Sequence, residues 1–333
     1  MWAIRNHTPY KVGRGWGRDK DGVHEWIVAV KGTFDIKPDG STALADEQLE
    51  PLLMPEYTGE PGISSLRYDA DIVATKPTTD ILLNATAYAP NGRPSTNFLV
   101  EAHVGGMHKA IRVLGNRTWG EGFVLEHSEP EPITQLSIGY ERAYGGYDCQ
   151  DPDPANQRMD ARNPIGCGVV AQASHHRGQP LPNFEYPNGN IEKDGPAGFG
   201  AIDSFWSPRR EFGGTYDEGW QQSRLPLLPL DWDSRSLLCA PQDQHPDTNL
   251  RGEELVQLTN LTPTGWLQFT LPKAYFTFST RISGRTEEHR SRLATVIIEP
   301  DFPRVIMVWH TALLCRTDVD YLDETIVREK RFI

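Results

Sequence analysis

The sequence predicts a mainly β fold, with antiparallel sheets arranged like a β-sandwich, long ordered loops rich in Gly, Pro and Trp, and little helix. The composition is the first reason, because 30 Gly and 26 Pro in 333 residues exceed average usage while hydrophobic residues make up 38%. The second is a series of β-branched and aromatic segments that end at turn signals. These segments follow one another without intervening helical patterns, which favours antiparallel pairing.

Four strands are predicted in the first third of the chain, at residues 25–36, 81–88, 98–104 and 109–114. The first ends at the turn sequence KPDG, and the second stops at PNG. The last two flank Gly105 and Gly106, which predicts a β-hairpin. Together they indicate an N-terminal antiparallel β domain over residues 1–135.

The remainder, residues 136–333, is predicted to hold a loop-rich middle region and a C-terminal β domain, which pack separately from the first domain or as one unit with it. Residues 133–138 are a strand candidate, and a short helix fits near Met159. Five further strands are predicted at residues 252–261, 266–271, 274–279, 293–298 and 304–314. The last two are the most apolar and predict a buried hairpin. The tail, residues 317–333, fits either an edge strand or a short helix.

Residues 196–252 stand out in the sequence for their closely spaced Trp, Gly and Pro residues. They contain three tryptophans among many Gly and Pro, with Arg and Asp close to each ring. Disordered linkers carry few aromatic residues, so we expect an ordered loop region. Two interpretations stay open, because Trp, Tyr and Arg dominate protein interfaces but also anchor long loops to a core.

Charge and apolar patterning limit the classes of partner. The net charge of −12 argues against nucleic-acid binding, which needs a basic surface. No apolar run reaches the length of a membrane span, and the first residues lack the pattern of a signal peptide. Four cysteines in so long a chain do not make a disulfide framework, which fits a reducing compartment. We therefore expect a cytoplasmic protein that binds neither nucleic acid nor membrane.

One catalytic hypothesis rests on paired carboxylates. Asp231 and Asp233 are two positions apart, and with Glu253 they could serve as the acid and base of a carbohydrate-active hydrolase. A salt-bridged loop with Arg235 explains the same residues. The sequence lacks the serine-hydrolase elbow, the phosphate-binding loop and the dinucleotide fingerprint. The expectation is a protein that is not an enzyme and needs no cofactor.

Two groups of residues are possible metal ligands. The acidic run Asp148, Asp151 and Asp153 is interrupted by proline and lacks the glycine and terminal glutamate of a calcium loop. A second group has no spacing known for zinc sites, namely Cys149, Cys167, His175 and His176. We expect no metal site. The pairs Gly145-Gly146 and Gly213-Gly214 lack a following helix and are expected to be turns with positive φ.

An ordered series of short motifs resembles one bacterial family. The motifs are ERAYGG at 141–146, NPIGCG at 163–168, LPNFE at 181–185, GFG at 198–200, WSPR at 206–209, GTYDEGW at 214–220, RLPLLPLDWDSR at 224–235 and APQDQ at 240–244. This series resembles the type VI secretion adaptors, formerly a domain of unknown function. His310 stands where an arginine is expected after the tryptophan.

The resemblance implies a cytoplasmic adaptor or chaperone that binds a secreted toxin effector and helps load it onto a spike of VgrG-type and PAAR-repeat proteins. A structural component of the spike is a third alternative. The candidates for partner binding or loop pinning are Trp206, Tyr216, Trp220, Arg224, Trp232 and Arg235. The expected structural motif residues are Glu141, Arg142, Gly145, Gly146, Asp231, Asp233 and Gln244, with an ion pair between Glu141 and Arg142.

Overall fold

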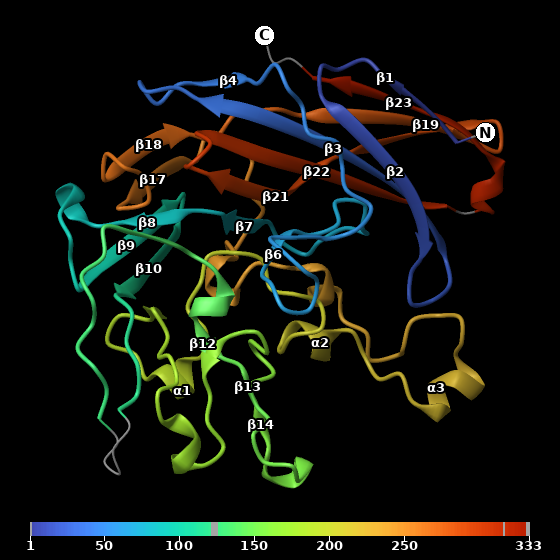
Figure 1. The fold of residues 1–333 in the computed structure, drawn as a ribbon. Helices are drawn as coiled ribbons and strands as arrows, with labels where there is room; N and C mark the ends of the chain where they lie inside the picture. Colours follow the sequence, from blue (N-terminus) through green and yellow to red (C-terminus); the bar gives the residue numbers. More distant parts are fainter. Residues whose placement is uncertain (1, 121–125, 316, 331–333) are drawn as a thin grey trace.

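The computed structural model describes residues 2–120, 126–315 and 317–330. Figure 1 shows the larger sheets on one side of the molecule and a layer of loops with short helices on the other. The described residues contain three short α-helices, α1 (Ile191–Asp194), α2 (Arg209–Phe212) and α3 (Glu218–Ser223). None of these is long and apolar enough to cross a membrane. The mainly β, mainly antiparallel, sandwich-like fold predicted from the sequence is confirmed.

The six-stranded sheet forms the centre of the fold. Its order is β2 (Lys11–Arg18), β3 (His24–Ile36), β22 (Arg304–Cys315), β21 (Arg292–Glu299) and β7 (Asp80–Leu83), with β4 (Thr42–Leu44) paired to β3. The predicted hairpin of the two most apolar runs is confirmed as β21 and β22. Only β7 runs parallel to its neighbour, β21. Because β7 is buried throughout, its first residue, Asp80, is carried into the interior.

Two further sheets flank the central one. The five-stranded sheet has the order β16 (Phe184–Glu185), β10 (Met107–Leu114), β9 (Asn97–Val104), β17 (Leu255–Thr259) and β18 (Trp266–Thr270). The predicted hairpin is confirmed as β9 and β10, with Gly105 at φ 57° in its turn. The four-stranded sheet has the order β1 (Ala3–Asn6), β23 (Leu322–Glu329), β19 (Phe276–Ile282) and β20 (Arg285–Arg290). Each of the three sheets combines strands from both predicted segments.

Two-stranded ladders organise the connecting segments. They pair β5 (Glu56–Tyr57) with β6 (Leu66–Tyr68), β8 (Thr86–Tyr88) with β11 (Gln135–Ser137), β12 (Tyr144–Gly145) with β15 (Cys167–Gly168), and β13 (Tyr147–Asp148) with β14 (Arg158–Met159). Met159 therefore lies in a strand, where a short helix had fitted the sequence. Prolines at 152 and 154 limit the nearby helix to a single 3-10 turn, Pro154–Asn156.

Three strand predictions need correction at their boundaries. The strand predicted at 81–88 is divided into β7 and β8, because the Asn84 side chain donates to Arg67 O and to Glu299 while the chain changes its partner from β21 to β11. The strand at 252–261 is confined to β17, since Gly252 and Glu253 adopt positive φ. The tail forms β23, which has neighbours on both sides and is not an edge strand.

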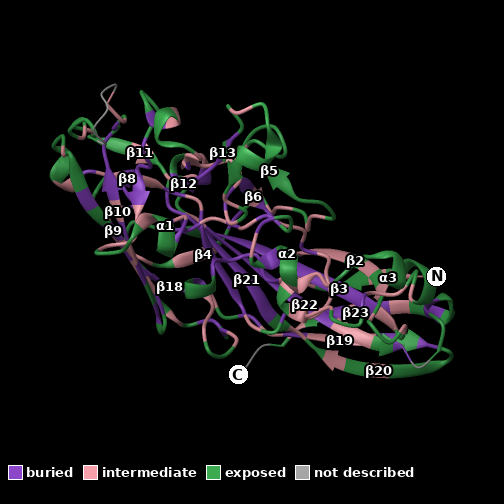
Figure 2. Cartoon of the chain, turned by 90° about the horizontal axis from the view of Figure 1, so that it is seen from below, coloured by how far each residue is buried: buried purple, intermediate pink, exposed green. Residues whose placement is uncertain are grey.

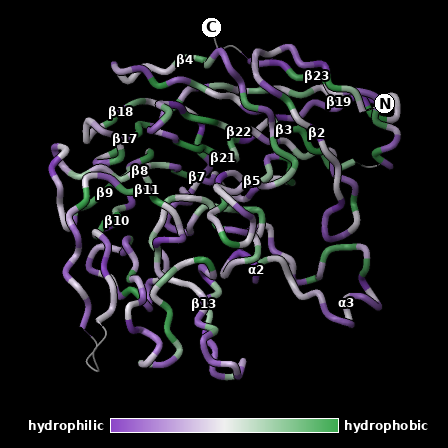
Figure 3. The backbone as a smooth tube through the Cα atoms, in the orientation of Figure 1, coloured by the Kyte–Doolittle hydropathy of each residue, from purple (hydrophilic) through white to green (hydrophobic). Residues whose placement is uncertain are grey.

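One apolar core joins the three sheets. It combines Val100 of β9, Phe278 of β19 and Trp309 of β22, all buried, in a single cluster. Figure 2 shows the buried residues concentrated in the central strands, and Figure 3 shows hydrophilic segments along the loops. The alternation of buried and exposed residues in β9 and β10 places one face of that hairpin on this core and the other toward solvent.

The turn at Gly145 generates a prediction. Gly145 has φ 149°, and a Cβ there would lie 2.2 Å from Asn163 O, whereas Gly92 has φ 65° with nothing within 4 Å of an added Cβ. Gly92→Ala should cost only the left-handed strain of roughly 1–2 kcal/mol. Gly145→Ala should cost more, because the backbone of Asn163 must also move. Urea denaturation of both variants measures the difference, and equal losses would contradict the close approach.

Candidate functional site

The loop layer, defined as residues 138–254, covers one side of the sheets (Figure 1). It encloses a cleft of about 570 Å³ whose walls come from residues around α2 and from the segment 235–247. Arginine, histidine and aspartate side chains line it together with aromatic and proline rings. Such a concave surface of mixed polarity at the junction of loops and sheet is the default candidate for a binding site.

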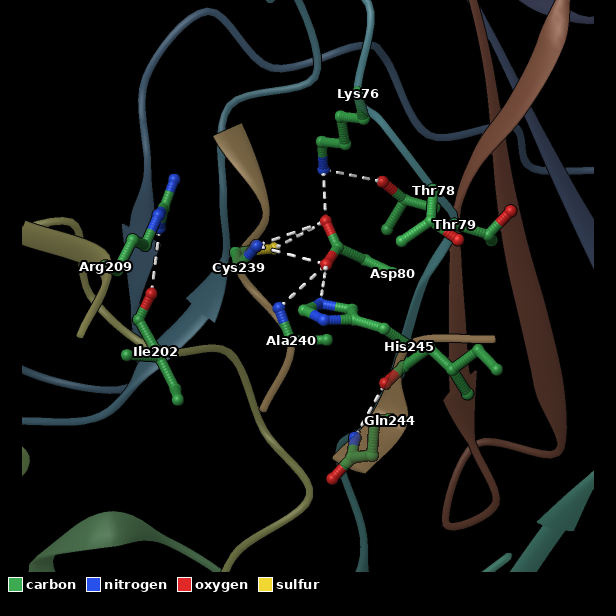
Figure 4. Close-up of polar contacts among 12 residues, drawn as sticks. Lys76, Thr78, Thr79, Asp80, Ile202, Arg209, Cys239, Ala240, Gln244 and His245 are labelled. Carbon is green, nitrogen blue, oxygen red and sulfur yellow. Dashed lines mark hydrogen bonds and ion pairs between the residues drawn. The ribbon is translucent and has the colours of Figure 1, made fainter. Parts of the chain in front are cut away.

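The Asp80 side chain lies beneath the cleft and has several polar contacts (Figure 4). Its carboxylate accepts hydrogen bonds from the backbone N–H groups of Cys239 at 3.1 Å and Ala240 at 2.9 Å, from Lys76 Nζ at 2.7 Å, and it contacts His245 Nε2 at 3.1 Å. Burial alone would raise the pKa of Asp80, but the Lys76 charge and the His245 contact hold it well below its usual range. The carboxylate therefore stays charged and ties β7 to the segment 239–245.

Lys76 completes this buried pair. Its ammonium also donates to Thr295 Oγ1 at 2.9 Å on β21. Burial would lower the pKa of Lys76, yet the adjacent Asp80 charge raises it. A fully buried ion pair of this kind contributes little net stability compared with apolar residues, but breaking it leaves an uncompensated charge. The cluster therefore fixes one arrangement of sheet and loop.

A second buried lysine lies on β10. Lys109 Nζ donates to Asp243 at 2.8 Å and to Gln244 Oε1 at 2.8 Å, and it lies 5.4 Å from the ring centroid of Tyr186. Burial lowers the pKa of Lys109 to about 8, although the Asp243 charge opposes the shift. Gln244 in turn donates to Ile81 O and Phe199 O, so it links the five-stranded sheet, the central sheet and the loop layer.

Arg209 anchors α2 at the wall of the cleft. Its guanidinium donates to Ser236 O, to Ile202 O and to the Asp69 carboxylate, at 2.9, 2.8 and 2.5 Å. The side chain is almost fully buried, so its donors are used inside the fold. The WSPR motif therefore supplies a structural arginine.

The predicted tryptophan candidates lie mostly inside the loop layer. Trp206 is buried, with its ring edge-on to Tyr140 at 5.5 Å, and Trp232 is partly buried. Trp220 is half-buried and its Nε1 donates to Leu227 O at 2.8 Å. Tyr216 is exposed and packs edge-on against Trp220 at 4.8 Å. Trp206 and Trp220 thus have contacts that pin loops, whereas Tyr216 is open to solvent.

The predicted arginines also make internal contacts. Arg224 Nε donates to Leu228 O at 2.9 Å and its Nη2 donates to Lys20 O, which joins α3 to the turn between β2 and β3. Arg235 donates to Asp233 with two nitrogens and lies 4.1 Å from the Phe212 ring centroid. Of the six candidates for partner binding or loop pinning, Arg235 is the one that lines the cleft.

The three carboxylates of the hydrolase hypothesis have separate partners. Asp231 accepts from the backbone N–H and the hydroxyl of Thr215, Asp233 pairs with Arg235, and Glu253 pairs with Lys273 beside β17. Hydrogen bonds from Thr215 lower the pKa of Asp231, and those from Arg235 lower the pKa of Asp233. None of the three lines the cleft beside α2.

The remaining structural motif residues lie around a buried asparagine. Asn163 Nδ2 donates to Tyr140 O and Tyr144 O, and Gly145 and Gly146 pass close to it with positive φ, as expected. In the second expected pair Gly214 has φ 84°, but Gly213 has φ −67° because it continues the helical conformation at the end of α2. The expected ion pair between Glu141 and Arg142 needs correction. Glu141 accepts from the N–H and hydroxyl of Ser65, both at 2.6 Å, while Arg142 turns to Asn183 Oδ1 at 3.4 Å. Neighbouring residues in a 3-10 turn point apart, so each side chain takes a different partner.

The structure brings one residue from each group of possible metal ligands, Asp148 and His175, into contact. Asp148 accepts from Ala171 N at 2.7 Å and contacts His175 Nδ1 at 2.8 Å. His176 is buried against Trp119, Cys149 is exposed and Cys167 is partly buried. Within the described residues, a different set is close enough to share an ion, namely Glu101, His103 and His108.

Sequence reasoning missed the buried charges Lys76, Asp80 and Lys109. One signal could have found Lys109, because it alternates with Met107, Ile111 and Val113 on the buried face of β10. Asp80 directly precedes three apolar residues of β7, but no pattern in the sequence identifies its distant partners. These partners come from segments about 160 residues away.

We predict that Asp80→Ala lowers the free energy of unfolding by about 3–5 kcal/mol, because it leaves Lys76 buried without its counter-charge. The matched control is Asp323→Ala, which removes an exposed pair with Arg281 and should change stability little. Urea denaturation measures both. Limited proteolysis should also cut the segment 239–247 faster in the Asp80 variant, and equal behaviour of the two variants would contradict its linking role.

One buried histidine, His310, and one partly buried histidine, His289, predict the pH dependence of stability. Burial lowers the pKa of His289 to about 4, and burial with the Lys76 charge lowers that of His310 to about 3. The unfolded chain binds protons on both below about pH 6.5, so stability should fall as pH falls from 7 to 4.5. Urea titrations at several pH values give the free energy of unfolding as a function of pH. The slope of that dependence should be smaller in His310→Gln than in the natural chain, by up to about 1.4 kcal/mol per pH unit. His7→Gln is the control, because His7 is exposed. An unchanged slope in His310→Gln would contradict a contribution of His310 to the pH dependence.

Comparison with known proteins places the chain in a family. No curated protein and no solved structure matches it. A family model described as an uncharacterized protein conserved in bacteria (DUF2169) matches residues 21–310. The matched span contains the central strands β3, β7, β21 and most of β22, together with the whole loop layer and the Asp80 and Lys109 clusters. The chain belongs to this bacterial family, DUF2169.

Proposed function

We propose that this protein is a cytoplasmic, non-catalytic adaptor that binds a protein partner through its loop layer. The specific partner proposed is a type VI secretion effector, which the adaptor helps to load onto a spike of VgrG-type or PAAR-repeat proteins. The secretion role rests on the resemblance of the motif series in residues 141–244. The choice of the loop layer rests on the structure.

The observation that carries the proposal is a group of large apolar side chains exposed on ordered loops. Phe205, Tyr216, Leu225 and Leu230 have exposed fractions of 76, 54, 60 and 76%. All four lie in the 26-residue stretch 205–230, around α2 and α3. Clusters of exposed apolar side chains are typical of protein-interaction sites, and these four lie within one short stretch of the chain. In free solution these side chains are hydrated, and a partner surface would remove them from water.

The loops that present these side chains are held in place. Trp206 is buried beside Phe205, Arg224 joins α3 to the turn between β2 and β3, and Asp217 caps α3 by accepting from Trp220 N at 2.8 Å. Fixed loops lower the ordering cost of binding, so more of the contact energy appears as affinity. Buried rings therefore fix the loops, and exposed rings contact the partner.

An adaptor must also release its cargo. An interface of standard size would bury about 1,200–2,000 Å² in total. The exposed apolar side chains supply a small number of anchors, and the surrounding polar loop residues supply the rim. An interface of this composition is compatible with recognition that is specific and still reversible.

We predict that the double variant Phe205→Ser, Leu230→Ser retains its partner at least about tenfold more weakly, since loss of interface anchors commonly costs more than 1 kcal/mol each. Its urea denaturation should match that of the natural chain, because both side chains are exposed. Tyr321→Ser is the matched control, since Tyr321 is equally exposed in the turn before β23. Trp206→Ala should instead lower stability by about 3–5 kcal/mol.

The partner itself is identified by affinity capture of the full chain from its native cytoplasm, followed by mass spectrometry. Recovery of a toxin-like effector, a VgrG-type protein or a PAAR-repeat protein, lost in the double variant, supports the adaptor. A protein that captures nothing, or captures equally in the double variant, contradicts it. Loss of glycosidase activity in Asp231→Asn would favour the hydrolase, and recovery of the chain in the secreted fraction would favour a spike component.

A further inference from the structure

The outer face of the β9–β10 hairpin carries two histidines and a glutamate close together. Glu101 and His103 are two positions apart on β9, so both point to the face opposite the buried Val100, Ala102 and Val104. His108 on β10 is the direct cross-strand partner of His103. The potential ligand atoms of the three side chains all lie within 4.8 Å of one another.

The two imidazole rings are stacked, with centroids 4.0 Å apart and an interplanar angle of 13°. Ring stacking by itself involves no hydrogen bond to the ring nitrogens. Within the described residues, neither histidine side chain nor the Glu101 carboxylate forms a hydrogen bond or an ion pair. Three potential metal-ligand groups therefore converge without a protein partner, on two partly buried residues and the exposed His108.

We propose that Glu101, His103 and His108 form a binding site for a divalent transition-metal ion such as Zn²⁺. Two imidazoles and one carboxylate are a common ligand set for zinc, with a further position left for water or another ligand. Zinc–nitrogen distances of about 2.0–2.1 Å separate two tetrahedral ligands by roughly 3.3 Å, so rotation of these side chains brings all three donors to one ion.

The position of the site favours entry of a cation from solvent. His108 is exposed and also borders a groove of about 540 Å³ that includes the side chains of Asp247 and Glu254, with Arg251. The net charge of −12 adds a general attraction for cations. Nitrogen donors disfavour Mg²⁺ and Ca²⁺, which prefer oxygen ligands, and so set the selectivity of the site.

The site is distinct from the loop-layer clusters. His108 and Lys109 are consecutive on β10, and the alternation of the strand places them on opposite faces. Lys109 takes part in the buried contacts with Asp243 and Gln244, whereas His108 faces solvent. Metal binding can therefore be tested without disturbing the residues proposed to bind a partner.

The test is isothermal titration of ZnCl₂ into the full chain, freed of any histidine tag and of metal. We expect one zinc ion per chain. His103→Ala and His108→Ala should each weaken binding by at least about 100-fold, because even loss of an outer-shell partner costs about 10- to 100-fold. Glu101→Gln should weaken it as well. MgCl₂ at the same concentrations should give no saturable binding.

His7→Ala is the matched control, because it removes an exposed histidine elsewhere on the protein. It should leave the zinc affinity unchanged. Circular dichroism and a thermal melt without metal confirm that each variant is folded, which is expected because His108 is exposed. The proposal is overturned if the natural chain binds no zinc, if the three site variants bind as tightly as it does, or if Mg²⁺ competes equally.

Discussion

The ion pair between Lys76 and Asp80 is the interaction on which the arrangement of sheet and loops depends. Asp80 begins β7, the one parallel strand of the central sheet, and its carboxylate faces the backbone of Cys239 and Ala240. Two charges in an apolar interior are costly unless every acceptor and donor is engaged. Here Lys76, two amides and His245 surround the carboxylate, so the segment 239–245 has one favourable position.

The Lys109 cluster repeats the same arrangement from another sheet. Lys109 of β10 meets Asp243 and Gln244, which follow the residues that meet Asp80 by only a few positions. One short segment, APQDQH, is thus held by charged groups from two sheets at once. The cleft lies beside this segment, so these buried polar contacts help to set its shape.

Much of the fold could be predicted from the sequence, because strands of β-branched residues ending at Gly and Pro carry their own local signal. The hairpins β9–β10 and β21–β22 were found in this way. The break at Asn84 could not be found, since it depends on contacts with Arg67 and Glu299 that only the folded chain creates. The same limit applies to Asp80, because its partners Cys239, Ala240 and His245 come from a segment far along the chain. The pairing of His103 with His108, by contrast, follows from the predicted hairpin around Gly105 and Gly106.

The aromatic loop residues show a related ambiguity. Trp206 and Phe205 are adjacent in sequence, yet one is buried against Tyr140 and the other projects into solvent. Composition identifies the segment as rich in rings but does not assign each ring to the core or the surface. The structure separates them, and the exposed rings Phe205 and Tyr216 both precede α3 in the chain.

The parallel pairing of β1 with β23 has a practical consequence for handling the protein. These two strands come from opposite ends of the chain and lie side by side in the four-stranded sheet, on the far side of the molecule from the loop layer (Figure 1). A fluorescent label, an affinity tag or a surface-immobilisation handle attached next to β1 or β23 is therefore on the side of the molecule away from the loop layer. Immobilised molecules would present the loop layer outward, in one orientation, to whatever is passed over them.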